Sequence, residues 1–537
     1  MHHSELFLAF ALVAVTAACA LGARRLQIPI SIVLVLVGLA LGFMPFMPPI
    51  ELSPELVLML LLPPLLYYSG VSMSWRGFKT HLRPILQLAV GCVIFTAAVV
   101  AGVMHWLLGL PLAVGFVLGA VVSPPDAVAP MAIARRYSVP GRILTVLEGE
   151  GLVNDATALI LFSFAVAAVL SGASFSIPAA IGQFLVIVAG EIVWGLFAGW
   201  ASLSLRRWAR ETRVEMLFSL LTPFAAFWVP EVLGGSGVLA TVTCGLFVSW
   251  NGPRFISPAT RLQGFFVWDL VVYMTEGMVF LLTGLQARLI VERLEPGGWS
   301  RVLIASAAVC AAVIVVRFIW VFVVIYGSRL IWRPLRTTEP APHWRQVFVV
   351  AFTGIRGVVS LAAALSIPLM AGGAPFPERD LLLLVTFAVI LVTLVGQGLS
   401  FPWVIKRLGL VDEGMREAAE HKRMEIAARV KSIDAALARL DALEGAASSP
   451  ETVDALRRRH GDRRAYFVAA CMDPSDDSAL SSSDLQRRFV EAERASIAEL
   501  YRKGEIHDDA RRRIERELDL EDSRLLHAQQ SGVTRAL

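Results

Sequence analysis

Ionisable side chains stand inside long apolar runs of this sequence, and the first of them accompanies a cluster of prolines. The apolar run 112–134 contains Ser-Pro-Pro-Asp-Ala-Val-Ala-Pro at 123–130, with Asp126 near its centre. Prolines so closely spaced remove backbone donors and break a helix. A charge within an apolar span is costly and marks a functional site, and a carboxylate beside freed helix ends can bind a cation or a proton.

A second set of polar residues opens the apolar run 143–170, which begins with Glu-Gly-Glu-Gly-Leu-Val-Asn-Asp-Ala-Thr at 148–157. Glu150 and Asn154 are one helical turn apart, and Asp155 lies next to Asn154, so the three side chains share one polar sector of a helix. The alternative to a binding site is a polar contact buried between helices. We favour the binding site, because a mere contact has no need of both a broken neighbour and an acidic run.

The third place is Thr-Gly-Ile-Arg-Gly-Val-Val-Ser at 353–360, where Arg356 stands between two glycines. Arginine keeps its charge, so Arg356 needs a carboxylate partner. The flanking glycines let another backbone approach or let the helix break. In the run 266–287, Glu276 and Asp269 either line a vestibule or pair with Arg317, and the sequence leaves both readings open.

The elements that must position these residues are membrane-spanning helices. Of the 537 residues, 56% are hydrophobic and 17% are charged, and apolar runs long enough to span a bilayer recur as far as residue 405. We therefore predict an all-α membrane protein with about thirteen transmembrane helices. The predicted spans are 5–22, 28–46, 55–71, 84–107, 112–134, 143–170, 177–204, 214–230, 232–250, 266–287, 300–328, 346–371 and 380–405.

The chain divides into a transmembrane domain at 1–406 and a charged, helical tail at 407–537. The proline-rich and Arg356 spans are each second from the end of a six-helix half, which predicts two inverted repeats with broken helices that cross at the substrate site. In the tail we expect helices at 413–443 and 482–526 and a loop near 473–484. Its charged residues form a solvated face or, alternatively, sense a ligand.

Lysine and arginine are concentrated in alternate connections between the spans. The positive-inside rule then predicts an N-terminus outside, a tail in the cytoplasm and a location in the cell inner (plasma) membrane. The lipid bilayer is thus one partner of the chain.

These features favour a secondary transporter for a small monovalent cation and protons. The competing class is a membrane receptor or sensor with a signalling tail. An enzyme is not expected, because the spans lack HExxH and GxSxG motifs. Nucleic-acid binding has no support, and five scattered cysteines without CxxC spacing give no sign of a disulfide framework or a metal cofactor.

The three motifs resemble those of the monovalent cation:proton antiporters of the NhaP/NHE type, the cation:proton antiporter 1 family. Ser-Pro-Pro-Asp-Ala-Val resembles its broken-helix motif, 149–155 resembles its Gly-Glu-Ser-Leu-Val-Asn-Asp motif, and 354–357 resembles its basic motif. The resemblance covers nearly the whole chain, and the tail at 491–525 is similar to that of the bacterial branch. It implies sodium/proton antiport, a role in pH homeostasis, a homodimer, and a six-helix core that moves against a dimer domain.

Carried over by position, the resemblance implies that Asp155 binds the cation or the proton and that Asn154 and Asp126 complete the sodium site. It implies a structural ion pair between Glu150 and Arg356. Thr157, Ser123 and Glu276 are candidate accessory residues. No cofactor is expected beyond the transported ions.

In the family that the chain resembles, Asn before the essential Asp goes with electroneutral exchange, so the resemblance implies that Asn154 accompanies exchange of one cation for one proton. Burial favours a protonated carboxyl and a bound cation favours a charged one, so we expect the two ions to compete for Asp155. Two family positions that hold hydroxyls are Gly151 and Pro125 here. Potassium and lithium therefore stay alternatives to sodium.

Overall fold

The computed structural model describes residues 2–26, 28–45, 53–171, 177–209, 211–292, 298–327, 342–371, 374–443, 450–472, 478–503 and 508–528. The chain forms two compact units, Met1–Val411 and Asp412–Leu537. The first unit begins with α1 (His2–Leu26), α2 (Ile30–Gly42), the π-helical η1 (Leu56–Leu61), α3 (Leu62–Ser72), α4 (Trp75–Thr80), α5 (Leu82–Leu86), the π-helical η2 (Gln87–Cys92), α6 (Val93–Leu108), α7 (Leu112–Val122), α8 (Val128–Arg136) and α9 (Gly141–Ser171).

It continues with α10 (Ile177–Ala209), α11 (Thr212–Val232), α12 (Val238–Phe255), α13 (Pro258–Glu292), α14 (Trp299–Phe322), the π-helical η3 (Val323–Gly327), α17 (Trp344–Phe352) and α18 (Val358–Leu365). A small antiparallel pair, β1 (Met370–Ala371) and β2 (Ala374–Pro375), precedes α19 (Arg379–Leu391), the π-helical η4 (Val392–Gln397) and α20 (Gly398–Arg407).

The described structure confirms an all-helical membrane protein, and most described residues of the predicted spans lie in helices. By length and composition, six described helices can cross a bilayer: Leu82–Leu108, Gly141–Leu170, Pro178–Ala209, Pro258–Glu292, Trp299–Gly327 and Arg379–Arg407. Shorter apolar stretches are Ile30–Gly42, Leu56–Ser72 and Leu112–Val122. The loop arginines of 328–341, which contribute to the predicted orientation, lie outside the described residues.

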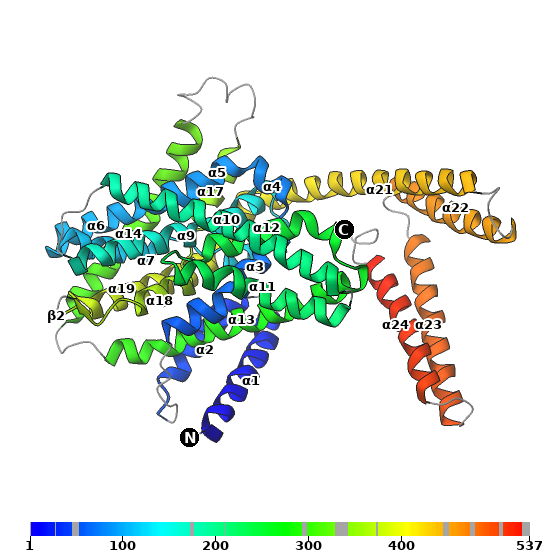
Figure 1. The fold of residues 1–537 in the computed structure, drawn as a ribbon, viewed down its shortest axis with the longest axis horizontal. Coiled ribbons are helices and arrows are strands. Elements are labelled where there is room, and N and C mark those ends of the chain that lie inside the picture. Colours follow the sequence, from blue (N-terminus) through cyan, green and yellow to red (C-terminus); the bar gives the residue numbers. More distant parts are fainter. Residues whose placement is uncertain are drawn as a thin grey trace. The chain divides into compact units, whose positions relative to one another are not determined.

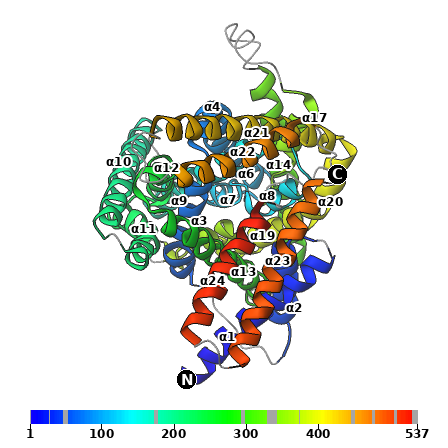
Figure 2. The same ribbon diagram turned by 90° about the vertical axis from the view of Figure 1, so that its right-hand side faces the viewer.

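The helices of the first unit pack in two groups (Figure 1). The scaffold group comprises α1, α2, α3 and α10 to α13, in which α13 lies along α2 and α12 contacts both α3 and α10. Figure 2 shows α10, α11 and α12 together on one side of this unit. The crossing group comprises α5 to α9, α14 and α17 to α20, with α7 packed between α6 and α9.

Two spans of the crossing group are interrupted, as predicted for the proline-rich span. Residues 123–127 separate α7 from α8, and residues 353–357 separate α17 from α18. The backbone N–H of Asp126 in the first break donates a hydrogen bond to the carbonyl of Ile355 in the second, at 2.7 Å. The two breaks therefore meet, and each satisfies part of the other's exposed backbone.

The span predicted at 346–371 ends earlier than expected. Helix α18 stops at Leu365, and residues 370–371 belong to β1. Pro368 accounts for the difference, because proline cannot continue a helix and biases the residue before it away from helical geometry.

Glycines bring the helices of the scaffold group into backbone contact. A Cβ added to Gly284 of α13 would overlap the carbonyl oxygen of Val35 in α2, and one added to Gly38 would overlap the carbonyl of Leu281. Gly70 of α3 and Gly245 of α12 meet in the same way. Such close crossings are how helices associate in lipid, where no hydrophobic effect drives them together.

We expect Gly284→Leu to destabilise the protein by about 1–3 kcal/mol or more, because the new side chain must push α2 away from α13. The measurement is the melting temperature of the detergent-solubilised protein. Gly102→Leu is the control, since a Cβ on Gly102 of α6 meets nothing within 4 Å. Equal melting temperatures for the two variants would contradict the packing described.

The second unit consists of two helical hairpins. The first hairpin consists of α21 (Leu410–Leu443) and α22 (Pro450–Met472). Phe467 of α22 packs against Ile426 and Ile433 of α21, and Arg464 of α22 pairs with Asp434 of α21 at 2.5 Å. Helices α23 (Ser478–Arg502) and α24 (Asp508–Ala528) lie side by side (Figures 1 and 2). The tail helix predicted at 413–443 lies within α21. The loop predicted at 473–484 is partly wrong, because its second half belongs to α23, and residues 473–477 lie outside the described residues.

Candidate functional site

A cavity of about 340 Å³ lies between the scaffold group and the crossing group. On one side it is lined by α3 and α13, and on the other by the two helix breaks and α9. Its polar lining consists of Tyr68, Ser69, Ser72, Asp126, Arg135, Glu148, Asp155, Glu276 and Ser360. Asp126, Asp155 and Glu276, three of the predicted site residues, therefore share one cavity.

Asp126 is fixed in place by both breaks. Its Oδ1 accepts a hydrogen bond from the backbone N–H of Val128 at 2.9 Å, at the start of α8. Its carboxyl group packs against Gly357, where an added Cβ would lie 2.5–2.6 Å from the carboxyl atoms. The buried Oδ2 has no partner among the described residues. One oxygen of Asp126 thus stabilises a helix N-terminus, while the other is available to a ligand.

Asn154 and Asp155 are neighbours in α9 with different surroundings. Asn154 is fully buried, does not line the cavity, and donates from Nδ2 to the carbonyl of Pro125 at 2.6 Å, which holds the first break. Its Oδ1 has no partner among the described residues. Asp155 lines the cavity, and no hydrogen bond or ion pair joins its carboxylate to any described side chain.

The predicted ion pair between Glu150 and Arg356 is wrong. Glu150 of α9 pairs instead with Arg317 of α14, through Nη1–Oε1 at 2.5 Å and Nη2–Oε2 at 2.9 Å. Both residues are at most 2% exposed. This bidentate geometry suits the guanidinium group and satisfies a charge pair that would otherwise be costly to bury.

Arg356 finds its partners among carbonyl groups. Its Nε donates to Val122 at 2.8 Å, its Nη2 donates to Ser123 at 3.2 Å, and its Nη1 donates to Gly354. Val122 and Ser123 form the C-terminal end of α7, where the helix dipole is negative. The carbonyls that a broken helix leaves free therefore take the place of the carboxylate partner predicted for Arg356.

The remaining predicted residues divide between the cavity and the protein interior. Glu276 lines the cavity from α13, whereas Asp269 is exposed elsewhere on the same helix, so neither partners Arg317. The hydroxyls of Thr157 and Ser123 donate to the carbonyls of Val153 and Ala120, and neither residue lines the cavity. Among the described residues, no three His, Cys, Asp or Glu side chains form a group that could hold a metal ion.

Two buried polar residues of this region, Arg317 and Ser360, are not among the site residues predicted from the sequence. Arg317 was considered only as a partner for residues of the tenth span. Ser360 is 2% exposed, lines the cavity and makes no hydrogen bond within the described structure. Its position three residues after Gly357, on the same face of a helix that starts at the break, is the signal that could have identified it.

One end of the cavity is bordered by an ion pair. Arg135, at the end of α8, lies 3.6 Å from Glu148, and their side chains are 62% and 20% exposed. Glu148 is seven residues before Asp155 in α9, which places both on the same helix face about 10 Å apart along the axis. Glu148, in its partly exposed pair, and Asp155 therefore line the same cavity from one face of α9.

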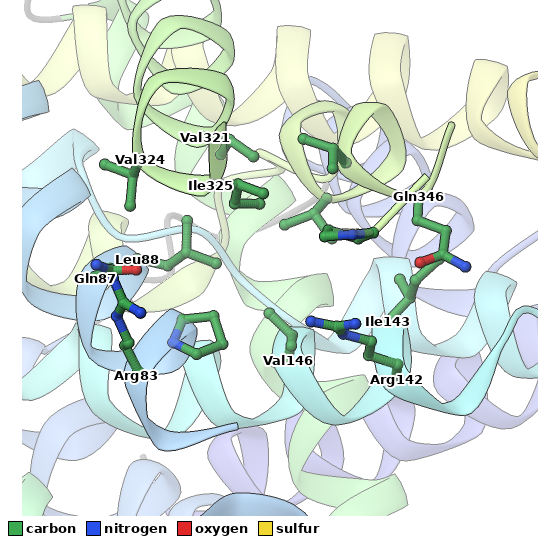
Figure 3. Close-up of a pocket in the computed structure, with 14 residues that line it drawn as sticks. Arg83, Gln87, Leu88, Arg142, Ile143, Val146, Val321, Val324, Ile325 and Gln346 are labelled. Carbon is green, nitrogen blue, oxygen red and sulfur yellow. The ribbon is translucent and has the colours of Figure 1, made fainter. Parts of the chain in front are cut away.

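A second, smaller pocket of about 70 Å³ lies within the crossing group (Figure 3). Arg83 and Arg142 project toward it, below the apolar side chains of Val321, Val324 and Ile325. It shares no lining residue with the carboxylate cavity and contains no carboxylate.

Comparison with known proteins assigns a family to this architecture. Residues 10–407 match the model of the family described as "Sodium/hydrogen exchanger, transmembrane". A Na(+)/H(+) exchanger of Mycobacterium tuberculosis is 34% identical over 96% of each chain. The Na(+)/H(+) antiporter ApNhaP of Aphanothece halophytica is 32% identical over 78% of this chain and 76% of its own.

A solved structure has the same fold. The sodium proton antiporter MjNhaP1 from Methanocaldococcus jannaschii superposes with a TM-score of 0.60 over 75% of this chain and 99% of its own, at 18% sequence identity.

Proposed function

This chain belongs to the sodium/hydrogen exchanger family and is a multi-pass transporter that exchanges sodium ions for protons, and from that premise we propose that the two ions compete for the carboxylate of Asp155. The observation that carries the proposal is the contrast between the carboxylates of the cavity region. Asp126 is held by α8 and Glu150 by Arg317, whereas Asp155 is bound by no described side chain. Glu276 also lines the cavity without a partner among the described side chains, but it lies on α13, whereas Asp155 lies on α9 beside the two helix breaks, so we propose Asp155 as the carboxylate that changes partners.

Charge neutrality explains why a proton and a cation replace each other. A buried carboxylate is stable when it is protonated or when a cation compensates it, and both states carry the same net charge. Asn154 adds no charge, and Arg356 lies within the same pair of breaks that fixes Asp126. We propose that one cation exchanges for one proton without net charge movement, and that protons on the loading side suppress cation binding. No resident cofactor takes part.

The finer setting of the protein is part of the same proposal. We place the N-terminus outside and the charged tail in the cytoplasm of an inner (plasma) membrane, because basic residues are concentrated in alternate connections. The Arg135 end of the cavity then faces the cytoplasm. We also propose a homodimer, as implied by the family. The tail remains a solvated helical region in this scheme.

Proton flux in proteoliposomes tests the proposal. Vesicles that carry a trapped pH dye are expected to show proton movement upon addition of sodium, with the rate unchanged when valinomycin and potassium clamp the membrane potential. Lithium and potassium form separate arms, since a relative from Bacillus pumilus is named a sodium, potassium, lithium and rubidium/H(+) antiporter. A rate that follows the membrane potential would contradict electroneutrality. Folded protein that moves no protons with any cation would contradict the transport proposal.

A further inference from the structure

We infer that the hydroxyl of Ser360 is a ligand of the transported cation and helps to set cation selectivity. The inference rests on the proposed function and extends it to a residue of the second broken helix. Ser360 lies in the first turn of α18, lines the cavity that holds Asp126 and Asp155, and is 2% exposed. Its hydroxyl is unpartnered within the described structure.

Among the described residues, two buried hydroxyls lack a partner, Ser360 and Ser306 of α14, and of these Ser360 alone lines the cavity. The buried helical hydroxyls of Thr283, Thr386 and Thr393 each donate to the carbonyl four residues earlier, at 2.8 Å. For Ser360 that carbonyl belongs to Arg356, which lies in the non-helical segment 353–357. The helix break therefore removes the usual partner and leaves the Oγ lone pairs available.

The direction of the Ser360 side chain follows from helix geometry. Gly357 and Ser360 are three residues apart, so they lie on the same face of the helix. That face meets the carboxyl group of Asp126, which packs against Gly357. Because Cα–Cβ bonds tilt toward the helix N-terminus, the Ser360 side chain leans back toward the break and the carboxylate.

Oxygen ligands are otherwise scarce on this wall of the cavity. Residues 125 and 151 are proline and glycine and offer no side-chain oxygen, and an added Cβ at Gly151 would lie 2.6 Å from the Cβ of Ala127. The nearby Asn154 does not line the cavity. Small cations lose water only when protein oxygens replace it. Ser360 supplies such an oxygen from the opposite broken helix.

The test compares Ser360→Ala and Ser360→Cys with the wild-type protein. Cysteine nearly keeps the volume but offers a soft sulfur in place of a hard oxygen. We expect both variants to raise the apparent KM for sodium and lithium by about tenfold, the factor that corresponds to about 1.4 kcal/mol, with a smaller effect on potassium and a maximal rate that is nearly kept. Equilibrium binding of radioactive sodium should weaken by the same factor.

Ser366→Ala is the matched control. Ser366 ends the same helix, its hydroxyl donates to the carbonyl of Ala363 at 2.7 Å, and it does not line the cavity. If wild type and Ser366→Ala exchange ions while the Ser360 variants keep wild-type KM values and selectivity, the hydroxyl binds only water and the inference fails. If the wild type itself moves no protons, the proposed function fails instead. An equal loss of exchange rate for all three cations, with an unchanged affinity for sodium, would also overturn the inference.

Discussion

Replacing Asp155 with Asn is expected to reduce sodium-driven proton flux by about 100-fold or more. A cation in the cavity would lose the carboxylate that compensates its charge, and burying the uncompensated cation would cost several kcal/mol. The amide also cannot take up a proton in the range where a carboxylate titrates. Both halves of the exchange cycle are therefore lost at once. The measurement is dye-reported flux in proteoliposomes that contain equal amounts of folded protein.

Asp412→Asn is the control for this substitution. It makes the same chemical change at an exposed position of α21 that does not line the cavity. We expect wild-type flux from it. A normal flux in Asp155→Asn would show that another carboxylate binds the ions, and Asp126 and Glu276 would be the next candidates.

The second large effect is expected at the buried ion pair. Glu150→Gln and Arg317→Met should each destabilise the protein by about 3–5 kcal/mol, because each leaves an uncompensated charge in the interior. The double variant should lose less stability than the two single variants lose together, since no lone charge remains. Melting temperatures of the single and double variants measure the coupling.

The same cycle distinguishes the two arginines. Glu150→Gln combined with an Arg356→Met change should show a much weaker coupling, since Arg356 donates to backbone carbonyls and not to Glu150. The exposed pair Arg288–Glu292, at 2.7 Å, is a control for which we expect about 0.5 kcal/mol or less. Stronger coupling of Glu150 to Arg356 than to Arg317 would restore the pairing first expected from sequence.

Much of this architecture can be predicted from sequence because lipid restricts the alternatives. An apolar run with no water around it must be helical, so the spans follow from composition. The first break follows from Pro124 and Pro125, and the importance of Asp126 and Asp155 follows from the cost of a charge within such runs. The structure adds that the two aspartates line one cavity.

Pairing between distant helices could not be predicted in the same way. Arg317 and Arg356 both stand in apolar runs, and nothing in their local sequence states which one reaches Glu150. The choice depends on the carbonyl groups that the end of α7 presents to Arg356, which exist only after the helix has broken. Ser360 could not be predicted for a related reason. Its hydroxyl is unpartnered because the residue four positions earlier, Arg356, lies in the break and not in the helix.

The glycine crossings of the scaffold group also hold one wall of the cavity. Helices α3 and α13 form one of its walls, and each rests on a neighbouring helix through glycines, at Gly70 against α12 and at Gly284 against α2. Gly284 lies eight residues from Glu276, about 12 Å along the helix. At these glycines backbone meets backbone with no side chain between them. The positions of α3 and α13 within the scaffold wall are therefore set by backbone thickness at residues remote from any ligand.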